Sequence, residues 1–247
     1  MMILELLALY LIRVILGYDS IITTTVISMQ EFTFIQQICI WALPVLFAIT
    51  LHEAAHAFVA WRCGDNTAKM FGRLSLNPIR HIDLFGTIIV PIIVGLLTQF
   101  HFVIGYAKPV PINWNFLKNP RRDVILVSLA GPAANFLMAF LWASGFKIAT
   151  LLDPQHSMPA LFLLLASRAG MLINLMLAFL NLIPIPPLDG SRVVMSILPP
   201  RLALNYAKIE PYGFLILLLL IFTDVLGYII IPLMNAGLSL LATIFQL

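Results

Sequence analysis

Charged side chains are scarce in this chain of 247 residues, because Asp, Glu, Lys and Arg together make up 10% of it. Soluble domains carry about 25%. Hydrophobic residues make up 61%, and the mean hydropathy is +1.01. These values exclude an ordinary soluble domain and predict an integral membrane protein with several spans. The basic residues stand mainly in short loops, as topology signals do, so we expect no nucleic-acid partner.

Cysteine and sequence repeats are also scarce. The two cysteines, Cys39 and Cys63, have neither metal-type spacing nor the pattern of a disulfide framework. No internal repeat is visible, which argues against a small-solute transporter with repeat symmetry. Residues 1–17 are apolar but lack a basic leader and a small-residue cleavage site. We therefore expect an interfacial helix or a short first span there, and no removed signal peptide.

Long apolar runs predict an all-α polytopic membrane protein with about five or six transmembrane segments. The runs cover residues 35–61, 84–104, 124–152, 159–183 and 213–247. As one helix the last would reach roughly 52 Å, against a hydrocarbon core of about 30 Å, so we expect a break near Asp224 to Gly227 or at Pro232. Basic loops flank residues 84–104 on both sides, which leaves a full span and a re-entrant segment as alternatives.

Residues 67–77 separate two apolar runs and alternate partly between apolar and polar positions. Met70, Leu74 and Leu76 are the apolar ones, and Asn77 and Pro78 end the pattern. Such alternation favours a small β-hairpin or strand. An edge strand could pair with an extended peptide, and an ordinary surface hairpin is the alternative.

The sequence His52-Glu53-Ala54-Ala55-His56 lies inside the first long apolar run. Histidines at positions i and i+4 share one helix face, so both imidazoles can reach one metal ion. A glutamate directly after the first histidine serves as general base in this motif. Ionisable groups at membrane depth are costly and mark functional sites by default. A structural histidine pair bonded to neighbouring helices is the alternative.

Catalytic zinc sites use three protein ligands and leave the fourth position to water. Asp189 is the best candidate for the third ligand, because it follows the proline-rich residues 184–187, where a helix cannot continue. Non-helical backbone at this depth is tolerated where it lines a cavity. A capping role for Asp189 in a following helix, residues 191–198, is the competing interpretation. Three other histidines are weaker candidates: His81, His101 and His156.

Polar residues interrupt two of the later apolar runs. In residues 131–135, Pro132 bends the helix, Gly131 allows close approach of a neighbour, and Asn135 projects an amide into a packed interior. An unremarkable helix–helix hydrogen bond is the alternative for Asn135. In residues 159–183, Arg168 and Asn174 are polar breaks.

Residues 52–56, 131–135 and 181–190, together with residues 105–113, resemble the site-2 protease family of intramembrane zinc metalloproteases. The resemblance is to the compact prokaryotic type without a PDZ or CBS module. It covers roughly residues 35–215, within a single membrane-embedded metalloprotease domain spanning residues 1–247. Residues 213–247 would then form one or more additional C-terminal hydrophobic segments.

The resemblance implies one zinc ion per chain, held by His52, His56 and Asp189, with Glu53 activating water. It also implies that Asn135 and Asn181 steady the substrate or the oxyanion. The expected activity is endopeptidase cleavage in or near transmembrane helices of membrane-anchored proteins, in the cell membrane of a bacterium or archaeon. A non-catalytic adaptor that binds transmembrane helices through the same cavity is the alternative, and the oligomeric state is left open.

Overall fold

The computed structural model describes residues 33–80, 83, 85, 89, 93 and 110–247. Four long helices dominate this part of the chain: α2 (Phe34–Cys63), α5 (Pro120–Leu151), α6 (Met158–Asn181) and α10 (Val225–Phe245). The shorter helical elements are α3 (Thr67–Met70), η2 (Pro78–Arg80), η4 (Trp114–Phe116), α7 (Asp189–Ile197), α8 (Pro200–Ala207), η5 (Glu210–Tyr212) and α9 (Gly213–Phe222). The predicted all-α architecture is thereby confirmed.

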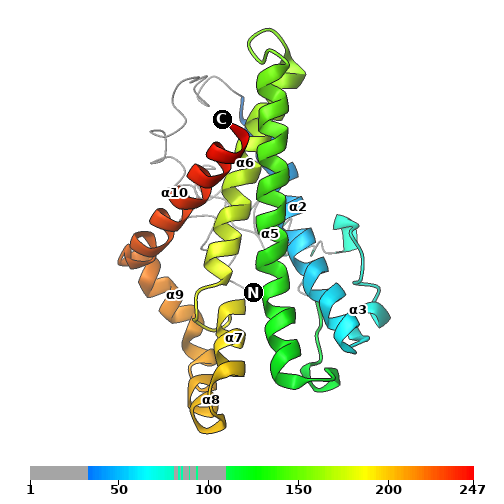
Figure 1. Cartoon of the computed structure of the whole chain (residues 1–247), viewed down its shortest axis with the longest axis vertical. Helices are drawn as coiled ribbons and strands as arrows, with labels where there is room; N and C mark the ends of the chain where they lie inside the picture. The colour runs from blue at the N-terminus through cyan, green and yellow to red at the C-terminus, as the bar shows by residue number, and fades with distance from the viewer. Residues whose placement is uncertain (1–32, 81–82, 84, 86–88, 90–92, 94–109) are drawn as a thin grey trace.

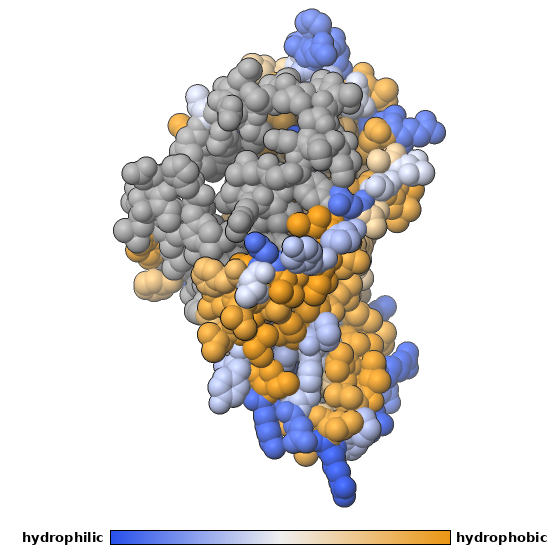
Figure 2. All heavy atoms as spheres, turned by 90° about the vertical axis from the view of Figure 1, so that its left-hand side faces the viewer, coloured by the Kyte–Doolittle hydropathy of each residue, from blue (hydrophilic) through white to orange (hydrophobic). Residues whose placement is uncertain are grey.

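Five helical stretches of the described chain are long and apolar enough to cross a membrane. They are Cys39–Cys63, Pro120–Leu151, Met158–Asn181, Pro200–Phe222 and Val225–Phe245. On the face shown in Figure 2, hydrophobic side chains cover most of the coloured surface, and hydrophilic ones gather at the two ends of the long axis and in a band across the middle. The protein is therefore a multi-pass integral membrane protein, as the composition predicts.

Helix α6 is the central helix of the bundle. It runs alongside α5 in Figure 1 and also packs against α2 and α10. Most of its membrane-length window, 78%, is buried within the protein, against 39% or less for each of the other four candidate spans. A helix with apolar residues on most of its faces belongs in such a core. The polar residue Asn174 lies in its middle and is fully buried, which calls for hydrogen-bond partners.

The strand or hairpin predicted for residues 67–77 is wrong, because Thr67–Met70 forms the short helix α3 and no strand occurs in the described residues. The cause lies just upstream, where Asp65 is fully buried and accepts hydrogen bonds from the backbone N–H and the hydroxyl of Thr67. These bonds turn the chain into a helical turn. The apolar positions Met70 and Leu76 are 84% and 67% exposed, so their alternation does not mark a buried sheet face.

Breaks in the helices fall where prolines and polar residues predict them. Helix α6 ends at Asn181, turns follow through the proline-rich residues 184–187, and α7 begins at Asp189. The C-terminal apolar run divides at Asp224, whose left-handed backbone, with a φ of 55°, separates α9 from α10. The predictions for residues 1–17, and the choice between span and re-entrant segment for 84–104, lie outside the described residues apart from positions 85, 89 and 93.

Candidate metal centre

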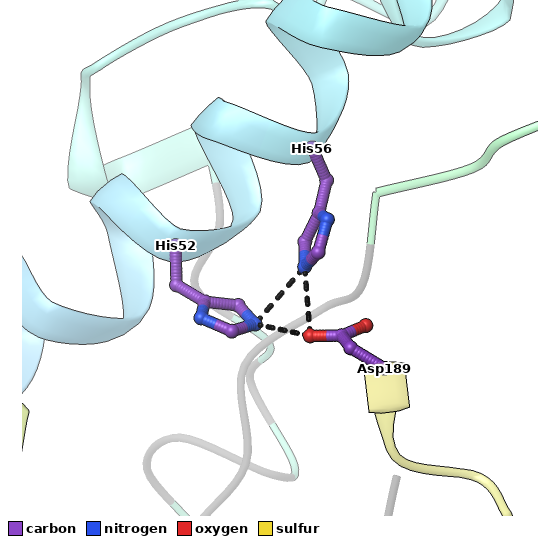
Figure 3. Close-up of side chains that lie close together, drawn as sticks. All are labelled: His52, His56 and Asp189. Carbon is purple, nitrogen blue, oxygen red and sulfur yellow. Dashed lines mark hydrogen bonds and ion pairs between the residues drawn. The ribbon is translucent and has the colours of Figure 1, made fainter. Parts of the chain in front are cut away.

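Three side chains from two distant segments converge on one point (Figure 3). His52 and His56 lie one turn apart on α2, and their Nε2 atoms are 3.0 Å from each other. Each Nε2 is 3.2 Å from Oδ2 of Asp189, the first residue of α7. Both histidines are buried. The triangle therefore brings together the two motif histidines and the predicted third ligand.

The other ring nitrogen of each histidine is held by α5. His56 Nδ1 lies 2.7 Å from the backbone oxygen of Val127, and His52 Nδ1 lies 2.6 Å from the side-chain oxygen of Asn135. A carbonyl oxygen can only accept, so in both rings Nδ1 carries the proton. Each Nε2 then has a free lone pair directed at the triangle, which is the tautomer that a metal-binding histidine needs.

The donor set fits a zinc ion. Two imidazole lone pairs and a carboxylate oxygen face one another, and Asp189 Oδ2 is buried without a hydrogen-bond partner. Such a group of acceptors is repulsive unless a cation or a proton lies between them. Zinc bonds of about 2.0–2.2 Å in a tetrahedron place ligand atoms roughly 3.3–3.6 Å apart. The observed 3.0–3.2 Å separations are close to that.

The position of Asp189 follows from the turns that precede α7. Its neighbour Gly190 lies against the end of α6, since a Cβ atom at Gly190 would be 2.3 Å from the backbone oxygen of Leu182. The hydroxyl of Ser191 donates to the backbone oxygen of Leu188 and closes the turn. Leu188 is the N-cap residue of α7, so the competing assignment of Asp189 as a cap does not describe its side chain.

Gly131 on α5 provides the room for both imidazoles. A Cβ atom at this position would lie 2.3 Å from His56 Nε2 and 2.5 Å from His52 Cε1. The sequence predicts close approach of a neighbour at Gly131, and here that neighbour is the pair of metal-site histidines.

Glu53 is half-buried and accepts a hydrogen bond of 2.9 Å from the backbone N–H of Val110. Val110 belongs to a loop, residues 110–113, that makes a second hydrogen bond at Asn113, whose N–H donates to the buried carboxylate of Asp65 at 2.8 Å. This loop is therefore hydrogen-bonded to the motif on α2 and to the turn that follows the helix. These backbone contacts leave no signal in the sequence.

The two asparagines predicted to contact substrate have different surroundings. Asn135 is fully buried, and its amide nitrogen donates to the backbone oxygen of Ala48 and to the side-chain oxygen of Asn174. Asn181 is half-buried at the end of α6 and donates to the backbone oxygen of Leu177. Asn174 was recognised from the sequence only as a polar break in an apolar run, and its hydrogen bond to Asn135 was not predicted.

Of the remaining histidines, only His156 lies in the described part of the chain, and it is not part of the triangle. His156 is exposed in the loop between α5 and α6, where it pairs with Asp153 at 2.9 Å. His81 and His101 lie outside the described residues.

Comparison with known proteins gives consistent matches along most of the chain. A family model described as Peptidase family M50 matches residues 40–150 and 154–223. A Bacillus subtilis protein named "Putative zinc metalloprotease YwhC" is 38% identical over 216 residues, which cover 83% of this chain and 91% of that protein. Mycolicibacterium smegmatis and Mycobacterium tuberculosis proteins named "Putative zinc metalloprotease Rip2" are 34% and 32% identical, and each match covers 74% of this chain and 66% of the relative. No solved structure matches the chain.

Proposed function

Because the chain belongs to peptidase family M50, a family of membrane-bound zinc metalloproteases, we propose that it cleaves peptide bonds in or near transmembrane helices of membrane-anchored proteins. The observation that carries the proposal is the position of the histidine–aspartate triangle. Its two histidines lie in the candidate span Cys39–Cys63 and are buried among helices. His52 precedes Arg62, in the last turn of α2, by ten residues, or roughly 15 Å along the helix. A substrate would therefore have to reach the site from within the bilayer.

The donor set of His52, His56 and Asp189 would hold the zinc ion, and zinc supplies a Lewis acid that polarises the scissile carbonyl and acidifies water. Glu53 would take a proton from the attacking water and pass it to the leaving amine nitrogen. A C–O bond forms at the carbonyl carbon while the C–N bond breaks. The N–H of Val110 holds the carboxylate of Glu53 in one orientation for this transfer.

A transmembrane helix resists hydrolysis because its peptide groups are hydrogen-bonded to one another. We expect the substrate to carry helix-breaking residues near the cleaved bond. Asn181 stands where α6 gives way to the proline-rich turns, and we propose that it contacts the opened substrate backbone there. The bilayer and the substrate helix are then the partners of the enzyme.

The experiment compares protein termini in membranes of cells that carry the wild-type chain or the Glu53→Gln variant. We expect new termini inside or beside predicted transmembrane segments with the wild type, and none of these with Glu53→Gln, which retains zinc. Asp153→Asn, in the loop that follows α5, is the matched control and should give the wild-type set. Identical termini in all three membranes would contradict the proposal and favour a non-catalytic adaptor that binds transmembrane helices.

A further inference from the structure

A continuous chain of hydrogen bonds connects the metal centre to the core helix α6. It runs from His52 Nδ1 to the side-chain oxygen of Asn135, 2.6 Å away, and from the amide nitrogen of Asn135 to the side-chain oxygen of Asn174, 2.9 Å away. The amide nitrogen of Asn174 ends the chain on the backbone oxygen of Gly170, also at 2.9 Å. Asn135 and Asn174 are both 0% exposed.

The direction of every bond in this chain is fixed by its two backbone ends. A backbone oxygen can only accept a hydrogen bond. The oxygen of Gly170 must therefore face the amide nitrogen of Asn174, and the oxygen of Ala48 must face the amide nitrogen of Asn135. The oxygen of Asn174 then accepts from Asn135, and the oxygen of Asn135 is left to face His52. His52 must therefore donate from Nδ1 and keep the lone pair of Nε2 for the metal.

Both amide hydrogens of Asn135 are used within the protein, one on Ala48 and one on Asn174. In this arrangement none is left to donate to a substrate or an oxyanion. The two amide hydrogens join α5 to α2 and to α6, as the helix–helix alternative expects. The amide oxygen adds a contact with His52 that helix packing alone does not require.

We propose that Asn174 and Asn135 are positioning residues of the metal centre, which set the tautomer and the ring orientation of His52. This inference rests on the proposed zinc site. Partners in the outer shell of a metal commonly affect metal affinity about 10–100-fold when removed. Asn174 acts through Asn135, so its contribution is present only while Asn135 is present.

The test is a double-mutant cycle read out by zinc affinity. The full-length apoprotein is purified in detergent, and its zinc dissociation constant is measured by competition with a chromogenic chelator. We expect Asn135→Leu to weaken zinc binding about 10–100-fold and Asn174→Leu about tenfold. The double variant should bind zinc as weakly as Asn135→Leu alone, because removing Asn174 has no further effect without Asn135.

Two variants separate positioning from general damage to the helix. Asn174→Asp should keep zinc affinity within about threefold of the wild type, because burial favours the neutral carboxyl group, which can accept and donate as the amide does. Ser167→Ala, a fully buried polar position on the same helix, should leave zinc affinity unchanged. If Asn174→Leu does not fold, Asn174→Ala takes its place in the cycle.

Wild-type zinc affinity in Asn174→Leu, or a loss in the double variant equal to the product of the two single losses, would overturn the inference. Failure of the Asp variant to keep this affinity would also count against it. Absence of zinc binding by the wild-type chain would instead overturn the proposed function, so the two failures are distinguishable.

Discussion

Gly131 and His56 approach so closely that a Cβ atom on the glycine would lie 2.3 Å from the imidazole Nε2. Gly131→Ala should therefore displace both metal-site histidines, while alanine itself favours the helix by about 1 kcal/mol over glycine. We expect zinc affinity to fall at least about tenfold, measured by chelator competition.

Gly145→Ala is the matched control on the same helix. Gly145 lies 14 residues, or about 21 Å, further along α5 than Gly131. A Cβ atom at Gly145 would lie 2.8 Å from the hydroxyl of Ser167. It should cost some stability and leave zinc affinity unchanged. Equal zinc affinity in the two variants would mean that the helices do not pack as described.

The N–H of Val110 is a contact of Glu53 that a single substitution can remove. Val110→Pro deletes the donor, and a residue before Pro111 is already biased toward the extended backbone that proline adopts. We expect unchanged zinc content and at least about tenfold slower formation of the membrane cleavage product, because Glu53 is no longer held. Val110→Ala keeps the N–H and should cleave at the wild-type rate. If cleavage is equally slow in both variants, the effect comes from loss of the valine side chain and not from loss of the N–H.

The buried carboxylate of Asp65 accepts hydrogen bonds from the backbone N–H groups of Asn113, in the loop, and of Thr67, in the turn after α2. Asp65→Asn places an amide group against a backbone donor, so we expect a loss of about 1.5–3 kcal/mol in stability, the value of a hydrogen bond to a charged group. Thermal unfolding in detergent would report it as a lower midpoint. Asp153→Asn, at an exposed position with φ of 52° that asparagine tolerates, should leave the midpoint unchanged.

Much of the fold could be predicted from the sequence because long apolar runs and prolines are strong local signals. The spans at α2, α5 and α6 and the breaks at Asp189 and Asp224 were of this kind. The strand at residues 67–77 failed because partial alternation is a weak signal, and the buried hydrogen bonds of Asp65 decided the local structure. Those partners could not be known before the chain was folded.

The candidate site divides in the same way. His52 and His56 share a helix face by spacing alone, and the proline-rich turns indicated Asp189. For Asn135 the sequence left two roles open, steadying the substrate or the oxyanion and a hydrogen bond between helices, and in the structure its amide nitrogen donates to Asn174 and Ala48. Such orientation depends on contacts between α2, α5 and α6 that no local pattern encodes. The contacts of Val127 and Val110 are made by backbone atoms, which any residue type could provide.

The metal centre is tested most directly by the zinc content of three purified full-length proteins: the wild type, Glu53→Gln and Asp189→Ala. We expect about one zinc per chain in the wild type and in Glu53→Gln, because Glu53 stands outside the ligand triangle, and a large loss in Asp189→Ala. Full zinc content in Asp189→Ala, or none in the wild type, would contradict it.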